Sequence, residues 1–164
     1  MAVTSKLELN RGDFSPRLFA NELLTISRLS ATSYRFARFL WENINAYADK
    51  DRSGWRDVQW QHYLTDPLCE FYAVYCHDEP AGCCEIVRES KLMRVAGGSV
   101  RINAFGLFPE FSGEGFGSSL LTRMIEKSFA TGADRVTLRT GQELLSEVTT
   151  MFRNQGFRIL TIEK

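Results

Sequence analysis

The sequence predicts an α/β fold in which one mixed sheet is covered by helices, and three observations lead to this expectation. Helical periodicity dominates the first third of the chain, β-forming residues fill the middle, and strand and helix patterns alternate in the last third. The 164 residues are 44% hydrophobic and 24% charged, which suits one domain with a substantial core. Since no internal repeat and no long linker interrupts the pattern, we expect a single domain over residues 1–164.

The first third of the chain is expected to hold a short strand and then helices. Residues 7–9 favour the strand, and from Ser15 or Pro16 to about His62 apolar residues recur at spacings of three and four. The residues in this pattern are Leu18, Phe19, Leu23, Leu24 and Ile26, followed by Phe36, Phe39, Leu40, Ile44 and Tyr47. The polar segment at residues 49–54 is expected to interrupt the helical region.

The middle of the chain is β in character. Residues 71–75 are rich in β-formers, residues 78–80 carry a turn signal, and residues 81–87 are expected to return as the second strand of a hairpin. A third strand is expected at residues 99–108, after a pair of glycines.

The last third of the chain predicts a helix, a strand, a second helix and a final strand. The apolar stripe of the first helix consists of Leu120, Leu121, Met124, Ile125 and Phe129. Gly132 is expected to end that helix, and residues 135–140 to form the strand after it. The second helix is expected from about Gln142 to Asn154, and the final strand at residues 157–162.

Charge and cysteine content exclude several classes of protein. Twenty Lys and Arg residues balance twenty Asp and Glu residues, so we expect neither a nucleic acid nor an anionic membrane as partner. No stretch approaches the roughly 18 apolar residues of a membrane span, and no signal pattern opens the chain, which predicts a cytoplasmic protein. The cysteines do not have the spacing of a zinc site, so we expect buried reduced thiols and no metal. They are Cys69, Cys76, Cys83 and Cys84.

The most informative segment is residues 106–121, where a strand end, a proline and a glycine-dense turn lead into an amphipathic helix. Gly113, Gly115 and Gly117 stand at alternate positions and leave backbone amides without side-chain cover. A helix beginning there adds unpaired amides, so the segment predicts an anion site, most plausibly for the phosphates of a cofactor. A P-loop would need a lysine after the glycines, and a dinucleotide fingerprint fits only loosely. A tight turn without a ligand would explain one or two of the glycines.

The same segment resembles the acetyl-CoA-binding signature of the GNAT acetyltransferase superfamily. The resemblance is carried by residues 105–121 and extends to residues 80–82, 132–140 and 152–157, so that it covers roughly residues 71–160. It implies a GNAT-like α/β fold, with a mixed and mostly antiparallel sheet flanked by helices. It also implies an N-acetyltransferase that moves an acetyl group from acetyl-CoA to a primary amine of a small molecule, by direct attack in a ternary complex. A non-catalytic acyl-CoA-binding or interaction module and a protein or peptide N-acetyltransferase are the alternatives.

The resemblance also implies the residues that hold acetyl-CoA. They are Phe105, Gly106, Leu107, Ser112, Gly113, Glu114, Gly115, Phe116, Gly117 and Ser118. The strand end at residues 105–107 is expected to separate from its neighbour near Thr140, which would admit the pantetheine arm and present a backbone N–H to the thioester carbonyl. The partner implied is a small-molecule amine acceptor, and a homodimer is left open.

Several positions depart from the family's pattern. Ser112 stands where the family commonly has Arg or Gln, and Glu114 stands where it often has Arg. Phe152 replaces the Tyr that protonates the departing thiolate in many members. A thiol with a pKa of about 8.5 can leave unaided, and water or a hydroxyl of Ser146, Thr149 or Thr150 could supply the proton.

The general base that the resemblance favours is Glu85, on the return strand of the hairpin. The alternatives are a chain of waters as base and a solvent-facing position for Glu85. The acceptor is expected to lie against the N-terminal helices and the hairpin, where four side chains could form aromatic walls. They are Trp55, Trp60, Tyr63 and Tyr75.

Overall fold

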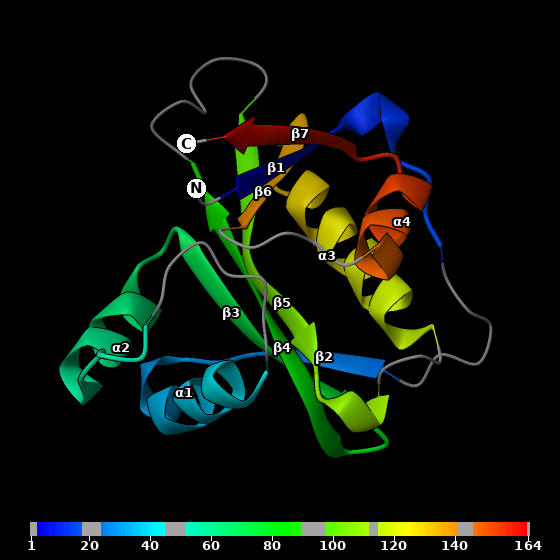
Figure 1. The fold of residues 1–164 in the computed structure, drawn as a ribbon. Helices are drawn as coiled ribbons and strands as arrows, with labels where there is room; N and C mark the ends of the chain where they lie inside the picture. The colour runs from blue at the N-terminus through cyan, green and yellow to red at the C-terminus, as the bar shows by residue number, and fades with distance from the viewer. Residues whose placement is uncertain are drawn as a thin grey trace.

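The computed structural model describes residues 3–17, 24–44, 52–89, 98–111, 115–140 and 146–163. Within these ranges a seven-stranded sheet lies between two pairs of helices (Figure 1). The strands are β1 (Val3–Asn10), β2 (Leu24–Arg28), β3 (Cys69–Cys76), β4 (Glu79–Arg88), β5 (Ser99–Leu107), β6 (Arg135–Thr140) and β7 (Arg158–Glu163). The helices are α1 (Tyr34–Asn43), α2 (Asp57–Thr65), α3 (Phe116–Ala130) and α4 (Ser146–Asn154).

The strands are ordered β2-β3-β4-β5-β6-β1-β7 across the sheet. All neighbouring pairs are antiparallel except β5 and β6, which run parallel. Two parallel strands need a connection that carries the chain back to the edge of the sheet where the first strand began. Helix α3 lies in the connection between β5 and β6. The mixed, mostly antiparallel sheet flanked by helices confirms the predicted fold class.

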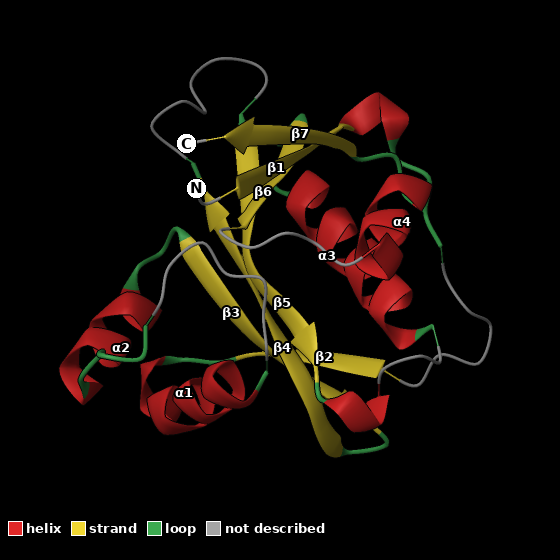
Figure 2. Ribbon diagram, in the orientation of Figure 1, coloured by secondary structure: helices red, strands yellow, loops and turns green. Residues whose placement is uncertain are grey.

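The two faces of the sheet carry different helices (Figure 2). Helices α1 and α2 cover one face, where Trp60 packs with Phe71, Ala73 and Cys83. Helices α3 and α4 cover the other, which holds the larger apolar core and includes Ile86, Ile102, Leu120, Met124 and Phe152. Because successive strand residues point to opposite faces, Cys83 and Cys84 contribute to different cores.

The helix expected to include Leu24 and Ile26 was wrong, because Leu24–Arg28 is strand β2. Leu24 is buried and Ile26 packs against the same core, so apolar side chains alternate over this short stretch as well as recurring at helical spacing. Pairing with β3 satisfies the backbone of β2 and decides between the two patterns. Residues 18–23 lie outside the described part of the chain.

The helix α1 is confirmed, and Leu40 and Ile44 are buried as its apolar pattern predicts, with Phe36 packed against the same core. Its buried residues are Tyr34, Ala37 and Leu40, while 49% of the Phe39 side chain is exposed. Ile44 follows as the buried C-cap, and Tyr47 lies outside the described residues.

Strand β1 and the hairpin turn differ in extent from their predictions. Strand β1 is longer than residues 7–9 and lies inside the sheet, between β6 and β7. The hairpin turn consists of His77 and Asp78, both with positive φ, since Cys76 already pairs with Glu79. Strands β5 and β6, helix α3 and its end before Gly132 are confirmed, as is helix α4 from Ser146 onward.

Three further expectations concern the cysteines, a membrane span and a metal site. All four cysteines are buried and free, as predicted, and burial raises the pKa of Cys69 to about 11. Along the described parts of the chain, no helix combines the length and apolar character needed to cross a bilayer. In the same parts, no three potential metal-ligating side chains lie together.

Candidate active site

The centre of the sheet opens between its two parallel strands. Strand β5 pairs with β6 from Ser99 to Ile102, opposite Arg135–Leu138, and among the described residues the pairing goes no further. Beyond that point β5 continues beside β4, whereas the end of β6 pairs with β1 (Figure 1). The separation predicted near Thr140 is therefore present, and it begins at Ile102 and Leu138.

A β-bulge lies at the point where the strands separate. Glu85 of β4 is opposite Ala104 and Ile86 is opposite Ile102, which leaves Asn103 as an extra residue in β5. In a regular strand residues three apart point to opposite faces, yet Ile102 and Phe105 share the core under α3. Asn103 points to the other face, where it bonds Glu85, and the bulge reverses the alternation beyond it, so that Phe105 returns to the core.

Strands β4 and β5 also approach each other closely at Gly82, which pairs with Leu107 at the end of β5. A Cβ atom on Gly82 would collide with the carbonyl oxygen of Gly106 and lie 2.9 Å from the Cα of Leu107. This position therefore requires glycine, which gives a physical reason for the Pro80-Ala81-Gly82 sequence.

Helix α3 begins close after β5 in the chain, and its N-terminus lies where the glycines predict an anion site. Gly115 is the N-cap residue in a left-handed conformation, with φ of 82°, and its carbonyl accepts the amide of Ser119 at 3.2 Å. The amides of Phe116, Gly117 and Ser118 precede the first intrahelical bond, so they belong to the positive end of the helix dipole. Ser112, Gly113 and Glu114 lie outside the described residues.

Room for a ligand at this helix end is shown by Gly117. A Cβ added there would meet only the sulfur of Met151, at an ordinary contact distance of 3.5 Å. Gly117 is thus not required by crowding within the described protein. Amides that lie before the first intrahelical hydrogen bond, on a residue without a side chain, are the kind of donors that hold phosphate groups such as the pyrophosphate of CoA.

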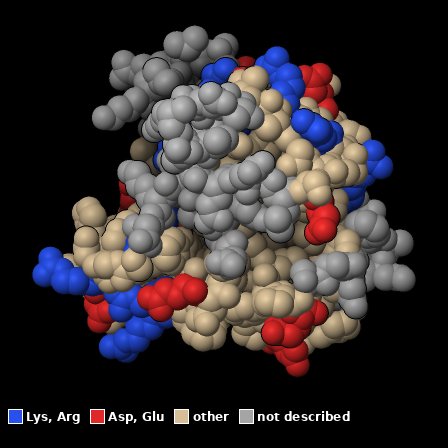
Figure 3. All heavy atoms as spheres, viewed as in Figure 1, with Lys and Arg blue, Asp and Glu red and all other residues tan. Residues whose placement is uncertain are grey.

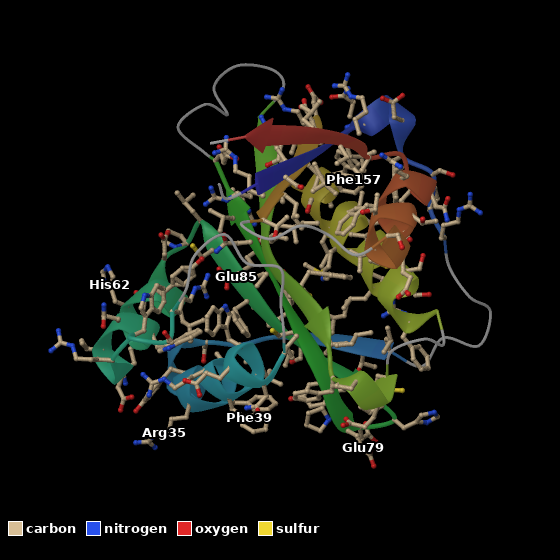
Figure 4. All side chains as sticks on the ribbon, in the orientation of Figure 1. Arg35, Phe39, His62, Glu79, Glu85 and Phe157 are labelled. Carbon is tan, nitrogen blue, oxygen red and sulfur yellow. The ribbon has the colours of Figure 1, made fainter. Side chains whose placement is uncertain are left out.

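Glu85 lies at the middle of the sheet, on the face that α1 and α2 cover (Figure 4). Its side chain is 0% exposed, so the alternative of a solvent-facing position was wrong. Arg52 binds both carboxylate oxygens, with Nη1 at 2.8 Å from Oε2 and Nη2 at 2.7 Å from Oε1. Asn103 donates from Nδ2 to Oε1 at 2.9 Å, and the hydroxyl of Tyr63 donates to the same oxygen. We call these four residues the Glu85 network.

Aromatic rings surround the cation of this network. The guanidinium carbon of Arg52 lies 4.5 Å from the ring centre of Tyr63, and 4.9, 5.4 and 5.7 Å from those of Trp55, Trp60 and Trp41. Burial alone lowers the pKa of Arg52, but hydrogen bonding and attraction to Glu85 outweigh it and raise the pKa above its ordinary value. Burial and the charge of Glu85 also raise the pKa of Tyr63, so both groups keep their protons.

Sequence reasoning missed Arg52, which it placed only in a polar turn. The available signal was Glu85 itself, because a carboxylate within an apolar strand needs a buried partner. Nothing in the spacing of the chain could select Arg52 from the other arginines, since 33 residues separate it from Glu85.

An open groove of about 500 Å³ runs along α2 next to the Glu85 network. The groove is lined by Trp55, Val58, Gln59, His62, Tyr63 and Asp66. Of the four side chains expected as acceptor walls, Trp55 and Tyr63 line this groove, whereas Trp60 is fully buried and Tyr75 packs against Phe36. Tyr63 connects the groove to the bulge, because its hydroxyl accepts a hydrogen bond from Asn103 at 3.2 Å. The view in Figure 3 shows side chains of both charges at the rim of the molecule, consistent with a formal net charge of zero.

Phe152 lies on the opposite side of the sheet from the network. It is fully buried, with ring centres 6.2 Å from Phe105 of β5 and 5.2 Å from Phe157. Ser146 and Thr150 are exposed on the same helix, and the Thr150 hydroxyl donates to the carbonyl of Ser146 at 2.9 Å.

Comparison with solved structures shows the same fold at low identity. A GCN5-related N-acetyltransferase from Kribbella flavida matches with a TM-score of 0.62 and 12% identity, over 98% of this chain and 57% of that one. A spermidine N-acetyltransferase from Vibrio cholerae gives 0.61 and 19%, over 83% and 80%. An aminoglycoside acetyltransferase from an uncultured soil metagenomic sample, in complex with sisomicin, gives 0.61 and 13%, over 81% and 87%.

The extent of these matches differs between relatives. The chain spans 57% of the Kribbella flavida protein and 58% of a functionally unknown conserved protein from Staphylococcus epidermidis, which is less than two thirds of either. A search of curated protein sequences found no significant match. The model of the Acetyltransferase (GNAT) family, however, matches residues 36–157, a span that includes the bulge, the strand separation and the start of α3. The chain therefore belongs to the GNAT family of acetyltransferases.

Proposed function

We propose that the chain transfers an acetyl group from acetyl-CoA to a primary amine of a small molecule. The observation that carries this proposal is the separation of β5 from β6 directly after the bulge at Asn103. Beyond Ile102 the edge of β5 is no longer paired with β6, and the chain goes on from β5 to the N-terminus of α3. Together they offer one place for a thioester and another for phosphates.

The residues that would hold acetyl-CoA fall into two groups. The amides of Phe116, Gly117 and Ser118 are positioned for the pyrophosphate, and Ser112, Gly113, Glu114 and Gly115 complete the expected loop. Phe105, Gly106 and Leu107 line the separated edge of β5, where the pantetheine arm would run. Bound there, acetyl-CoA supplies an acyl group already activated as a thioester.

The protein's contribution to transfer is alignment and stabilisation of charge. A bond forms between the amine nitrogen and the carbonyl carbon while the carbon–sulfur bond breaks. Of the two protons that the ammonium loses on becoming an amide, one goes to a base or to solvent, and the thiolate gains the equivalent of the other. A backbone N–H of the bulged segment would stabilise the negative charge that develops on the carbonyl oxygen. Holding both reactants in line removes much of the remaining barrier, so few side chains are needed.

The two proton transfers remain predictions. Glu85 is the candidate base, and a chain of waters is the alternative. Because Phe152 carries no proton to donate, the thiolate would leave unaided or take a proton from water, Ser146, Thr149 or Thr150.

The groove on α2 is the proposed acceptor site. Its volume of about 500 Å³ is that of a small-molecule pocket, Trp55 and Tyr63 offer aromatic walls, and Asp66 supplies a carboxylate for a cationic group. Two relatives are named for spermidine and aminoglycoside acetylation, but identities of 19% and 13% indicate the fold alone. The acceptor class therefore rests on the residues of this groove.

Thermal shift with acetyl-CoA, followed by release of free thiol in a panel of small amines, tests the proposal. We expect acetyl-CoA to raise the melting temperature and at least one amine to release CoA. In the variant Gly117→Trp the indole should block the phosphate site, so the shift should disappear while the protein stays folded, since a Cβ fits there.

The matched control is Gly12→Trp, because Gly12 is exposed and a Cβ on it meets nothing within 4 Å. The control should keep the full shift. If wild type shows no shift, the acetyl-CoA proposal fails. A shift without thiol release from any amine would instead identify a non-catalytic acyl-CoA-binding module.

A further inference from the structure

We infer that Glu85 is a positioning residue: through Asn103 it holds the bulge of β5 in the conformation that acetyl transfer requires, and the proton of the amine goes to solvent. The inference rests on the proposed function and deepens it, because it assigns the Glu85 network to the thioester side of the reaction. It replaces the expectation that Glu85 is the base.

The first step is that the Glu85 carboxylate is enclosed and already bonded at both oxygens. Its side chain is 0% exposed. Oε1 accepts from Arg52 at 2.7 Å, from Asn103 at 2.9 Å and from the hydroxyl of Tyr63, and Oε2 accepts from Arg52 at 2.8 Å. Each oxygen has about two lone-pair positions, so Oε1 is fully used and Oε2 keeps one. A base must have a lone pair directed at the proton it removes, and a proton on Oε2 would have to lie in a site closed to solvent, beside the guanidinium that binds the same oxygen.

The second step is that Arg52 does not leave readily. It is 3% exposed, binds both carboxylate oxygens and lies among four aromatic rings. Its departure would leave the buried Glu85 carboxylate without its cation. Glu85 is therefore held in a buried ion pair in the folded protein.

The third step connects this anion to the strand separation. Asn103 is the extra residue of the bulge, and its Nδ2 donates both to Glu85 and to the Tyr63 hydroxyl. Loss of the bulge would shift β5 by one residue and turn its last residues, Phe105 among them, toward the opposite face. The network thus anchors the bulge on one face while Phe105 anchors it in the core on the other.

Two double variants test the assignment, since both remove the buried charge pair at once. In Arg52→Met with Glu85→Gln, the amide oxygen can still accept from Asn103. In Arg52→Met with Glu85→Leu, a side chain of similar size cannot. Neither variant has a carboxylate base, so any difference between them reports on the anchor.

We expect the Gln variant to keep kcat within about tenfold of wild type, and the Leu variant to lose about 100-fold more, the usual effect of losing one donor to the carbonyl oxygen. Acetyl-CoA should bind more tightly than CoA in wild type and in the Gln variant, and equally tightly in the Leu variant. In the free proteins, the backbone amide resonances of residues 103–105 should stay near their wild-type positions only in the Gln variant. For wild type and Gln alike, kcat/KM should rise with pH toward the pKa of the acceptor amine.

Equal losses of about 10²–10⁴-fold in both variants, with a changed pH profile, would overturn the inference in favour of a catalytic base. Wild-type amide resonances in both variants would also overturn it, whether or not any acceptor has been found. If wild type binds no acetyl-CoA, the proposed function fails, and the resonance comparison still decides whether Glu85 holds the bulge.

Asn103→Ala provides a second route should the double variants fail to fold. It leaves the Arg52–Glu85 pair complete and removes only the link to the bulge. We expect kcat and the preference for acetyl-CoA over CoA to fall as in the Leu variant. Wild-type behaviour of Asn103→Ala would contradict the inference.

Discussion

The two faces of the sheet are built on different principles, although they share the same strands. Under α3 and α4 lies a continuous apolar core to which β4 contributes Cys84 and Ile86. Under α1 and α2, the residue between them, Glu85, is the centre of a buried ion pair enclosed by aromatic rings. One face depends on filling volume, which many side chains can do, and the other on completing specific bonds, which few can do.

The difference matters because the two faces meet at the bulge of β5. Phe105 enters the apolar core while Asn103 enters the Glu85 network. The strand separation is thus held from both sides, and substitutions on the two faces should lower the free energy of unfolding by different amounts. Three predictions test this contrast, from the largest expected effect to the smallest.

The first and largest effect is expected from Arg52→Met. Removing the cation leaves Glu85 buried and unpaired, which should lower the free energy of unfolding by about 3–5 kcal/mol. Urea unfolding measures this change, and adding Glu85→Gln should recover most of the loss because no unpaired charge then remains.

Arg38→Met is the matched control, since Arg38 pairs with the exposed Asp57 and the pair is open to solvent. That pair should contribute only about 0–1 kcal/mol. If both arginine variants were destabilised by the same small amount, the Glu85 network would not be the organising feature of its face.

The second effect is expected from Phe152→Leu in the apolar core. Phe152 packs between Phe105 and Phe157, and a smaller apolar side chain leaves a partly refilled space. We expect a loss of about 1–2 kcal/mol in urea unfolding, smaller than that of Arg52→Met. Acetyl-CoA should still raise the melting temperature of this variant. A loss as large as that of Arg52→Met would remove the contrast between the faces.

The third and smallest effect concerns Glu70, an ion-pair residue at the margin of the apolar core. Burial alone raises its pKa, but hydrogen bonds from Tyr72 and Arg88 outweigh burial and hold the pKa below its ordinary value. A folded pKa below the unfolded one, about 4.3, means that the ionised carboxylate stabilises the protein above that pH. The contribution is lost as the pH falls through the folded pKa.

The variant Glu70→Gln should therefore be less stable than wild type near pH 7, with the gap closing below about pH 4. Unfolding curves measured across this range give the comparison, and Glu126→Gln, which alters an exposed carboxylate of α3, is the control. A gap that stayed constant with pH would show that Glu70 does not contribute through its charge.

Sequence patterns predicted the second half of the chain better than the first. Residues 99–140 contain strong local signals: Gly115 for a left-handed N-cap, an apolar stripe for α3, and Gly132 at the end of that helix. The described segment around Leu24, residues 24–28, has no glycine to mark a helix boundary. Both a helical and an alternating pattern fit it, and only pairing with β3 decides that it is a strand.

The candidate site likewise has one part that local sequence predicts and another that depends on long-range contacts. Gly117 and the amides around it belong to one local motif, so their place at the start of α3 could be read from the sequence. Arg52 and Asn103 could not be connected to Glu85, because their hydrogen bonds join side chains 33 and 18 residues apart. The insertion of β1 between β6 and β7 is likewise a long-range pairing.

By itself the sequence determined the GNAT family, the α/β class and the position of the glycine-rich helix start, because each depends on neighbours along the chain. The tertiary structure alone decided that Glu85 is buried and bonded at both oxygens, and that β5 bulges at Asn103 where it leaves β6. The physical reason is that a buried charge takes its partner from wherever the fold brings a donor, and β4, α2 and β5 meet only after folding.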